Sequence, residues 1–422
     1  MSYLQVLLVG VNHKTAPLEV RERLAFTSGE IPEALRSFGR LAQGPVILST
    51  CNRTEIYCGV EDMAEGMRQV RELWAQSRDL PLETIERYLF VASGIEAARH
   101  LFRVSAGTDS MIVGEAQILG QVKAAYQMAT ATNQLPISIS HLFHQALKVG
   151  KRARTETDIS RHAVSISSAG AELARRTFGD LEQCRVLVIS AGQAGKLTAK
   201  SLKSLGASQL VVLNRTYERA VEVARELGGT AVPFHELPAA LASSDVVVSA
   251  TDSSELVVTA DMVRRAMAAR GGPGLIFIDL AVPRDIDPQA RAIPGVALFD
   301  VDDLRVQAGE NLHERTQEVK AVEAIVEGEV EKFSQWWSSR QALSVIAALE
   351  KRAEAIRRSE LKKTLKRLPD LSGEGHERIE ALSRAIVNKI LHAPVSTLRD
   401  RGDDDGYIQA ARQLFDLDGK EP

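Results

Sequence analysis

Short apolar runs separated by polar turns open the chain and predict a small α+β unit. The runs Val6–Val11, Val46–Leu48 and Ile56–Val60 have strand length. Apolar positions at helical spacing lie between and after them, and the pattern stays helical from Gly94 onward. The predicted helices are Leu18–Phe26, Pro32–Leu41, Met63–Gln76, Ile95–Ser105, Ala116–Ala131 and Ile137–Thr155.

A second region alternates strands and helices. It follows a predicted helix at Ile166–Phe178, and its first strand is apolar throughout, as expected for a parallel strand that is buried on both faces. Repeats of strand, helix and strand predict a right-handed, doubly wound sheet, that is, an α/β Rossmann-like domain. The predicted strands are Arg185–Ile189, Leu210–Leu213, Val246–Ser249, Leu275–Ile278 and Val296–Phe299.

The last region is helical. From Glu310 to Leu368 the sequence has no proline and only one glycine, Gly328, which predicts one long helix. Its apolar residues form a coiled-coil-like seam, and a seam of this length needs a partner helix. A second stripe at Glu377–Leu391 and a final helix that ends at Phe415 complete an all-α dimerisation domain. The seam residues are Val319, Val322, Val326, Val330, Phe333 and Trp337.

The long helix also carries a basic run interleaved with Glu350, Glu354 and Glu360. Alternating charge is typical of a solvated helix face, and an RNA contact is the alternative interpretation. The changes of pattern predict three domains, at 1–160, 161–305 and 306–422. The basic residues are Lys351, Arg352, Arg357, Arg358, Lys362, Lys363, Lys366 and Arg367.

Composition narrows the class of protein. The 422 residues are 45% hydrophobic and 25% charged, as in ordinary globular proteins. No apolar stretch approaches the ~20 residues of a membrane span. The N-terminus lacks the features of a signal peptide, so we expect a cytoplasmic protein. The three cysteines predict neither disulfides nor a metal site. With a net charge of −3, any nucleic-acid contact needs a local basic patch.

The strongest candidate for chemistry is the polar break after the Val46–Leu48 strand. It places Cys51, Asn52 and Arg53 side by side on a predicted loop. A neighbouring cation favours the thiolate, which is the nucleophilic form of cysteine, and loops on rigid scaffolds often carry reactive groups. The alternative is that Cys51 is only a small buried apolar residue.

Three other segments carry candidate ligands. The loop Gly10–Thr15 follows the first strand, and we expect it at the same sheet edge as Cys51 if the two strands pair in parallel. The segment Gly107–Glu115 is either a ligand-facing loop or an ordinary helix connection. The basic end of the helix at Ile137–Thr155 either complements the helix dipole or contacts phosphate. Its cations are Lys148, Lys151, Arg152 and Arg154.

A glycine-rich turn follows the Arg185–Ile189 strand and precedes a helix, which is the context of a dinucleotide-binding fingerprint. Ser190 replaces the usual first glycine, whereas Gly192 remains where the pyrophosphate must approach the backbone. The next strand ends without the acid that NAD enzymes carry, and a guanidinium there can bind a 2′-phosphate, so we predict NADPH. The predicted coenzyme-binding residues are Ser190, Ala191, Gly192, Gln193, Ala194, Gly195, Asn214, Arg215 and Thr216.

A thiol nucleophile together with an NADP-binding sheet suggests a thioester that is reduced by hydride. Four segments, in this order, closely resemble the glutamyl-tRNA reductase family: Gly10–Pro17, Leu48–Tyr57, Gly114–Lys123 and Lys151–Thr157. The resemblance spans the whole chain, is strongest up to about Ser168 and is looser in the helical tail.

The resemblance implies NADPH-dependent reduction of glutamyl-tRNA(Glu) to glutamate 1-semialdehyde, the first step of the five-carbon route to 5-aminolevulinate and tetrapyrroles (porphyrin biosynthesis). Cys51 would attack the ester that joins glutamate to the tRNA ribose, and the resulting enzyme thioester would be reduced to the aldehyde. His100 matches a histidine that the family needs for full activity, although it could simply pack, and His13 is a rival acid/base. The implied substrate-binding residues are Thr50, Asn52, Arg53, Ser110, Glu115, Ala116 (through its backbone only), Gln117 and Gln121.

The family architecture implies a catalytic domain and an NADP domain strung along a spinal helix, and a homodimer formed by the C-terminal helices. It also suggests hand-off of the reactive aldehyde to the aminomutase that consumes it. Because the thiol and the coenzyme lie on different domains, we expect a hinge closure. Two other functions stay open: an NADP-dependent acyl-phosphate or acyl-CoA aldehyde dehydrogenase that acts through Cys51, and a non-catalytic NADP-binding regulator.

Overall fold

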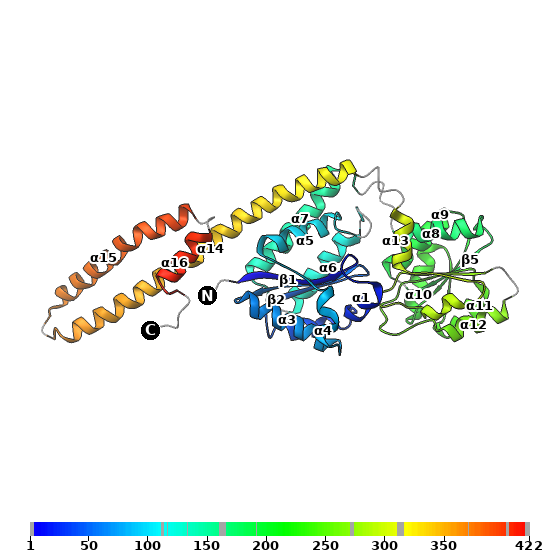
Figure 1. Cartoon of the computed structure of the whole chain (residues 1–422), viewed down its shortest axis with the longest axis horizontal. Coiled ribbons are helices and arrows are strands. Elements are labelled where there is room, and N and C mark those ends of the chain that lie inside the picture. The colour runs from blue at the N-terminus through cyan, green and yellow to red at the C-terminus, as the bar shows by residue number, and fades with distance from the viewer. Residues whose placement is uncertain are drawn as a thin grey trace. The chain divides into compact units, whose positions relative to one another are not determined.

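The computed structural model describes residues 4–110, 114–115, 117–132, 134–159, 166–190, 192–270, 274–309, 316–369, 371–401 and 405–417. The chain forms two compact units, Val6–Glu327 and Gly328–Pro422, the latter together with Met1–Gln5. The first unit contains two sheets, and Figure 1 shows that the regular elements of the described part of Gly328–Pro422 are helices. Among the described residues, no helix combines the length and the apolar character needed to cross a membrane.

The first sheet has four strands in the order β2-β3-β1-β4. β2 and β3 form an antiparallel hairpin in which Leu48 lies opposite Glu55, and β4 pairs with β1 in the antiparallel sense. The three predicted strands are confirmed. β4 was not predicted, because its four partly exposed residues lack the apolar run that marks a buried strand. The strands are β1 (Gln5–Asn12), β2 (Gln43–Ser49), β3 (Arg53–Val60) and β4 (Phe90–Ser93).

Helices cover both faces of this sheet, with α5, α6 and α7 on one side and α3 and α4 on the other (Figure 1). All six predicted helices are confirmed, each within a few residues at its ends. Asp62 caps α3 by accepting a hydrogen bond from the Glu65 amide, which explains its sharp start. The helices are α1 (Leu18–Leu24), α2 (Ile31–Phe38), α3 (Met63–Ser77), α4 (Leu82–Ile85), the 3-10 turn η1 (Glu86–Tyr88), α5 (Gly94–Ala106), α6 (Gln117–Thr132) and α7 (Ile137–Glu156).

The second sheet has six strands in the order β10-β9-β8-β5-β6-β7, and each pairing between neighbours is parallel. This order reverses between β5 and β8, which is the point where doubly wound sheets bind nucleotides. The five predicted strands and the predicted fold are confirmed, whereas the three-residue β7 was not predicted. The strands are β5 (Arg185–Ile189), β6 (Gln209–Leu213), β7 (Thr230–Val232), β8 (Val246–Ser249), β9 (Leu275–Asp279) and β10 (Val296–Phe299).

Both faces of the parallel sheet are apolar, and its side chains alternate between two hydrophobic clusters. Val186 and Val188 face the helices α8, α9, α10 and α13, whereas Leu187 and Ile189 face α11 and α12. Burial on both faces therefore explains the unbroken apolar run that predicted β5. The helices are α8 (Ile166–Phe178), α9 (Gln193–Ser204), α10 (Tyr217–Leu227), η2 (Phe234–Glu236), α11 (Leu237–Ser243), α12 (Ala260–Ala269), η3 (Pro288–Ala292) and α13 (Val301–Gly309).

The second unit contains most of α14 (Thr316–Lys366), together with α15 (Gly373–Asp400) and α16 (Asp405–Leu414). α15 runs back along α14 (Figure 1), and apolar residues of α14, α15 and α16 form one cluster. The long helix is confirmed over its described residues, since 310–315 lie outside them. α15 is longer than predicted at both ends, because Ser372 caps its start and Pro394 lies within the helix instead of ending it.

The stripe predicted on α15 stays largely exposed within this chain. Leu382, Ile386 and Ile390 are 60%, 48% and 65% exposed. Ile386 and Ile390, together with apolar residues of α14, border a groove of about 460 Å³. This apolar groove is the kind of surface that a further helix covers.

Candidate active site

Cys51 lies in the turn of the β2–β3 hairpin, and Thr50 builds that turn. The Thr50 hydroxyl accepts hydrogen bonds from the amides of Asn52 (3.2 Å) and Arg53 (3.3 Å), and the Thr50 amide donates to the Arg53 carbonyl (2.8 Å). These bonds hold the turn that presents the thiol. The structure therefore uses the Thr50 hydroxyl, which we had predicted to face the substrate, to shape the loop.

The loop after β1 meets the Cys51 loop at the same sheet edge. The His13 amide donates to the Asn52 carbonyl (3.0 Å), and the Asn12 side chain holds its own loop by accepting from the amides of Lys14 and Thr15. The predicted neighbourhood is correct, but not through direct pairing of β1 and β2, since β3 lies between them.

Behind the loop lies a buried network of charged side chains that we name the Arg53 network: Arg53, Glu55, His100 and Asp109. Arg53 Nη1 lies 2.7 Å from Glu55 Oε1 and 3.4 Å from Asp109 Oδ2. His100 Nε2 lies 2.8 Å from Glu55 Oε1, and His100 Nδ1 lies 3.6 Å from Asp109 Oδ2. The side chains of Arg53 and Glu55 are 1% and 0% exposed, so this is a desolvated ion-pair network.

Neighbouring groups complete the Arg53 network. The Tyr57 hydroxyl donates to Glu55 Oε2 (2.7 Å), Lys14 pairs with Asp109, and Arg53 Nη2 donates to the Asp109 carbonyl. Burial alone would raise the pKa of Glu55, but His100 and Arg53 lower it to about 2. Arg53, which the family resemblance implies as a substrate-binding residue, thus has both terminal nitrogens in contact with protein oxygens.

Several buried polar atoms beside the network have no hydrogen-bond partner among the described residues. They are Asn52 Oδ1, Ser110 Oγ, His13 Nδ1 and Arg53 Nε. Buried polar atoms are normally paired, so a group of unpaired ones around one loop marks a place where a polar ligand can bind. Three of the predicted substrate-binding residues, Asn52, Arg53 and Ser110, belong to this group.

The remaining predicted substrate residues lie at the start of α6. Glu115 is buried, and Gln117 and Gln121 are half-buried and one turn apart on the same helix face. Ala116 lies outside the described residues. The nearby Gly114 needs to be glycine, because it has a φ of 84° and an added Cβ would lie 2.0 Å from the Ile159 carbonyl oxygen.

The basic end of α7 has a structural role at Arg154. This guanidinium donates to the carbonyls of Ser105 (2.9 Å), Gly150 (2.7 Å) and Glu115 (3.0 Å). Arg152 pairs with Glu156 on the same helix. The interpretation as a helix end is therefore favoured over a phosphate contact at these two residues, and Arg154 fixes the backbone of Glu115.

The surroundings of Cys51 hold its sulfur as a thiol in this conformation. Burial and the Glu115 carboxylate raise the pKa of Cys51 to about 12, while Arg21 and Arg53 act in the opposite direction. Arg53 thus lowers the pKa of Cys51, as predicted for a neighbouring cation, but burial raises this pKa by more. Cys51 packs against the apolar cluster of the parallel sheet that also includes Ala194. All three cysteines are free.

Neither candidate histidine hydrogen-bonds the Cys51 sulfur within the described part of the chain. His100 instead lies between Glu55 and Asp109, so it is part of a polar network and does not merely pack. Burial, aided by Arg53 and Lys14, lowers the pKa of His13 to about 3. His13 is therefore a neutral imidazole at physiological pH.

The coenzyme fingerprint is built mainly from backbone. Ser190 takes a φ of 108°, the conformation for which the first position normally uses glycine, and its hydroxyl accepts a hydrogen bond from the Gly192 amide (3.1 Å). Gly192 is the N-cap residue of α9, and an added Cβ there would lie 3.2 Å from the Ala250 carbonyl oxygen. A helix start with an open glycine backbone fits a pyrophosphate. Gln193, Ala194 and Gly195 form the first turn of α9, and Ala191 lies outside the described residues.

The end of β6 supplies the other predicted coenzyme residues. Arg215 is exposed, and its Nη2 donates to the hydroxyl of Ser253, which follows β8 (2.7 Å). Asn214 holds the turn by donating to the Thr216 carbonyl (3.0 Å). Three strands of the sheet thus bring their carboxyl ends to one edge, and an exposed guanidinium at that edge is available to a phosphate.

Three residues of the site were not predicted: Glu55, Asp109 and Arg21. Glu55 and Asp109 lie in predicted site segments, but a carboxylate among apolar or small residues gives no sign that it is buried beside an arginine. Arg21 is buried because it links Cys51 to the parallel-sheet domain through Asp302. Only the three-dimensional structure brings residues 21, 51 and 302 together.

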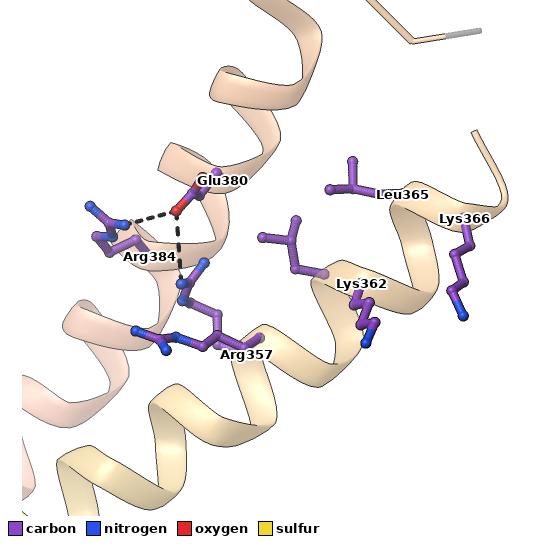
Figure 2. A pocket seen from close by; sticks show the side chains of 8 residues that line it. Arg357, Lys362, Leu365, Lys366, Glu380 and Arg384 are labelled. Atoms are coloured by element: carbon purple, nitrogen blue, oxygen red, sulfur yellow. Dashed lines mark hydrogen bonds and ion pairs between the residues drawn. The ribbon is translucent and has the colours of Figure 1, made fainter. Parts of the chain in front are cut away.

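A basic pocket of about 560 Å³ lies between α14 and α15 in the other unit (Figure 2). Arg357 and Arg358 bind Glu354, and Arg384 binds Glu380, so most of its positive charge is balanced internally. Lys362 and Lys366 make no ion pair with any described residue. The pocket therefore resembles a solvated helix face more than an RNA site.

Family models match three successive parts of the chain. The model described as the N-terminal domain of glutamyl-tRNA(Glu) reductase matches residues 9–157. The shikimate/quinate 5-dehydrogenase model matches residues 172–306, which supports a pyridine nucleotide coenzyme at the parallel sheet. The model for the dimerisation domain of glutamyl-tRNA(Glu) reductase matches residues 321–417.

Whole-chain similarities agree with these matches. The glutamyl-tRNA reductase of Geobacter sulfurreducens is 41% identical, over 99% of this chain and 98% of its own. The enzyme of the same name from Syntrophobacter fumaroxidans is 42% identical, over 99% and 92%. The solved structure of glutamyl-tRNA reductase from Methanopyrus kandleri is 38% identical, covers 98% of this chain and 99% of that chain, and superimposes with a TM-score of 0.52.

Proposed function

The chain belongs to the glutamyl-tRNA reductase family, and on that premise we propose that it reduces glutamyl-tRNA(Glu) to glutamate 1-semialdehyde through a thioester on Cys51. This is the first step of the five-carbon route to 5-aminolevulinate and tetrapyrroles. One observation carries the proposal for the site: the Cys51 loop has unpaired buried polar atoms at Asn52 and Arg53, and Cys51 itself packs against the apolar cluster of the coenzyme domain.

The reaction balances in two steps. The Cys51 sulfur bonds to the glutamyl carbonyl carbon, the ester bond to the tRNA ribose breaks, and the ribose oxygen leaves with a proton. When bound, NADPH supplies the hydride that reduces the thioester carbonyl. The carbonyl oxygen takes a proton to form a hemithioacetal, which then collapses to the aldehyde and the free thiol. NADP⁺ and deacylated tRNA are the other products.

The residues of the loop divide this work. Asn52 and Ser110 offer unpaired polar atoms to the glutamyl group, and Gln117 and Gln121 extend this surface along α6. Arg53 supplies positive charge for the substrate carboxylate, with Asp109 and Glu55 as the partners that the substrate would replace or share. His100, held by Glu55, is the acid/base that we favour for the leaving ribose oxygen, and neutral His13 is the alternative.

Cys51 must lose its proton before it attacks. Because burial and Glu115 hold the pKa of Cys51 near 12, the thiolate forms only when its surroundings change. Glu115 is itself buried, and burial raises the pKa of its carboxyl group and so favours the neutral form. A proton held on Glu115 would remove the negative charge that opposes the thiolate.

We assign NADPH as the coenzyme, in preference to NADH. The family comparison supports a pyridine nucleotide, and Arg215 supports the choice between the two. A guanidinium at the end of the second strand of the sheet can hold the 2′-phosphate, whereas a carboxylate there would repel it. Ser190 and Gly192 would hold the pyrophosphate through the backbone at the start of α9.

The other expected partners follow from the family and from the surface of the second unit. The exposed stripe Leu382, Ile386 and Ile390 supports a homodimer through the C-terminal helices. We expect a cytoplasmic enzyme that hands its aldehyde to the aminomutase. A pull-down without association, together with release of free aldehyde at the full turnover rate, would count against that hand-off.

The test of the proposed function is to trap the acyl-enzyme. Incubation with glutamyl-tRNA but without NADPH should leave a glutamyl adduct on the Cys51 peptide in mass spectrometry. Cys51→Ser should abolish both the adduct and NADPH oxidation, and Cys184→Ser, a buried cysteine in the other domain of the same unit, is the matched control. An adduct elsewhere, or an unmodified Cys51, would refute the assignment. Activity with an acyl phosphate or acyl-CoA but not with charged tRNA would favour the aldehyde dehydrogenase alternative.

A further inference from the structure

Helix α1 contacts the carboxyl edge of the parallel sheet through two consecutive residues, Arg21 and Glu22. Arg21 is 2% exposed and holds two groups with one guanidinium. Its Nη1 donates to the Cys51 carbonyl (2.7 Å), and its Nη2 lies 2.6 Å from Asp302 Oδ1. The same side chain therefore touches the backbone of the nucleophile and a carboxylate of the coenzyme domain.

The Asp302 carboxylate is presented by a well-fixed helix start. Asp300 caps α13 by accepting hydrogen bonds from the amides of Asp302 and Asp303, both at 3.1 Å. Asp303 returns a bond by accepting from the Asp300 amide (3.0 Å), and Arg291 holds Asp300 (2.6 Å). The carboxylates of Asp300 and Asp303 accept hydrogen bonds within this cap. Among the described residues, the carboxylate of Asp302 does not, so it is available to Arg21.

A second ion pair at the same contact differs in one respect. Glu22 binds Arg284 Nε (2.6 Å) and Nη2 (2.8 Å) and accepts from the Arg284 amide (2.8 Å). This pair has more hydrogen bonds than the Arg21–Asp302 pair, but its side chains make no hydrogen bond to the Cys51 loop within the described residues. The Glu22–Arg284 pair therefore only joins the two domains, whereas the Arg21–Asp302 pair both joins them and contacts the backbone of the nucleophile.

We propose that Arg21 is a positioning residue that couples closure of the coenzyme domain to presentation of Cys51, with Asp302 as the contact that signals closure. This inference rests on the proposed function. When Asp302 meets Arg21, the guanidinium is fixed and in turn fixes the Cys51 carbonyl, so the acyl-sulfur is held against the sheet that binds the coenzyme. A lysine cannot replace it, because one ammonium nitrogen cannot span both acceptors in the planar arrangement of a guanidinium.

The electrostatics of the thiol agree with this geometry. Burial and Glu115 raise the pKa of Cys51, and Arg21 is the strongest of the groups that oppose them, ahead of the backbone amide and Arg53. Arg21 therefore acts on the sulfur by charge as well as by holding its carbonyl. Its Nε is buried without a partner among the described residues, so Asp302 and the Cys51 carbonyl are its stabilising contacts.

The experiment measures the two half-reactions separately on the full-length enzyme. Acyl transfer is followed by quenching and mass spectrometry of the Cys51 peptide without NADPH. Hydride transfer is followed by mixing the preformed acyl-enzyme with NADPH and recording the loss of NADPH absorbance in a single turnover. Wild type, Asp302→Asn and Glu22→Gln are compared, and each variant is first checked for folding by circular dichroism.

Asp302→Asn should slow hydride transfer by about 10- to 100-fold, because it removes the charge that pairs with a buried guanidinium. It should leave acyl transfer within about twofold of wild type, because Asp302 makes no contact with Cys51 itself. Glu22→Gln should slow hydride transfer by no more than about threefold. A larger effect of Glu22→Gln, or equal effects of Asp302→Asn on both half-reactions, would overturn the coupling.

A substitution at Arg21 gives a readout that a purely structural role would not move. In Arg21→Met, alkylation of Cys51 by iodoacetamide should shift to higher pH, with Glu115 and Arg53 as the remaining charges that face the sulfur. Arg21→Lys should keep the wild-type pH profile but show the slow hydride step. The double variant Arg21→Lys/Asp302→Asn should be no slower than the slower single variant. Additive effects, or an unshifted Arg21→Met profile, would refute the proposal, whereas failure of wild type to form the thioester would instead refute the proposed function.

Discussion

The nucleophile loop and the coenzyme edge are both strand ends in the first unit, but they are built in different ways. Around Cys51 the working parts are buried charged side chains, such as Arg53 and Glu55, which are 1% and 0% exposed. At the coenzyme edge the working parts are backbone groups at Ser190 and Gly192 and an exposed guanidinium, Arg215. The first region depends on side-chain pairing and the second on backbone conformation.

This difference determines how each region responds to substitution. A buried charge that loses its partner destabilises the fold strongly, because water cannot replace the partner. An exposed charge that is lost mainly changes which ligand binds. We therefore expect substitutions in the Arg53 network to affect stability first and substitutions at the coenzyme edge to affect selectivity first.

The largest expected effect is that of Glu55→Gln. It removes the charge that pairs with both Arg53 and His100 and leaves the shape nearly unchanged. We expect a loss of about 3–5 kcal/mol in unfolding free energy, measured by urea denaturation. The control is Glu65→Gln, which breaks an exposed, solvent-screened pair with Arg68 and should leave the urea midpoint nearly unchanged. Equal effects of the two substitutions would show that the network is solvated in the native protein.

Acidification should weaken the same region. The pKa of Glu55 is about 2 in the native protein, below its ordinary value of 4.5, so the unfolded chain takes up a proton first as the pH falls below about 4.5. The pKa of His13 is about 3, below its ordinary value of 6.5, so His13 acts in the same direction and starts near pH 6.5. Both groups therefore contribute stability that is present at neutral pH and is lost on acidification.

Other groups stabilise the protein as the pH falls, so the test compares the pH dependence of stability in wild type with that in a variant. Burial raises the pKa of Asp279 and of Asp285, and these carboxyl groups favour the native state as the pH falls. We therefore compare the urea midpoints of wild type and His13→Gln from pH 7.5 to pH 4.5, a range that lies mostly between the ordinary and native pKa values of His13. The variant should lose less stability than wild type over this range. Parallel curves would mean that His13 titrates normally.

A smaller and more selective effect is expected for Arg215→Asp. If the guanidinium holds the 2′-phosphate, reversing its charge should weaken NADPH binding on the order of 10- to 100-fold and leave NADH nearly unchanged. Titration of the two coenzymes by fluorescence measures the ratio. Arg225→Asp, in the last turn of α10, is the matched control and should alter neither. Equal weakening of both coenzymes by Arg215→Asp would remove Arg215 from phosphate recognition.

The coenzyme edge and the Cys51 loop also differ in how much of their structure the sequence could predict. The coenzyme edge follows a local rule, since a buried strand, a glycine turn and a helix lie next to one another in the chain, and its elements were predicted within a few residues. The two strands that flank Cys51 and the loop between them were also predicted, because two apolar runs flank a polar break, but their antiparallel pairing was not. Short and partly exposed elements such as β4 lack any period and were missed.

The contacts that organise the nucleophile are not local, so the sequence could not show them. Arg21, Cys51 and Asp302 are far apart in the chain and meet only because α1 packs against the coenzyme domain. The sequence shows the arginine beside Cys51, which lowers the pKa of the thiol. It does not show the loss of water around the sulfur, which raises that pKa by more. Desolvation is a property of the assembled fold.

The smallest expected effect, that of Ser190→Gly, examines the one departure from the coenzyme fingerprint. Ser190 has a φ of 108°, a conformation that strains a residue with a side chain by about 1–3 kcal/mol. Glycine would relieve that strain but lose the hydrogen bond from the Gly192 amide, worth about 1 kcal/mol, and would give the unfolded chain more freedom. We therefore expect a stability change below about 1 kcal/mol and unchanged NADPH affinity, whereas Ser190→Val, with its branched side chain at positive φ, should destabilise the domain clearly. If Ser190→Gly instead abolished coenzyme binding without unfolding the protein, the serine hydroxyl itself would be a ligand, and the backbone account of this edge would be wrong.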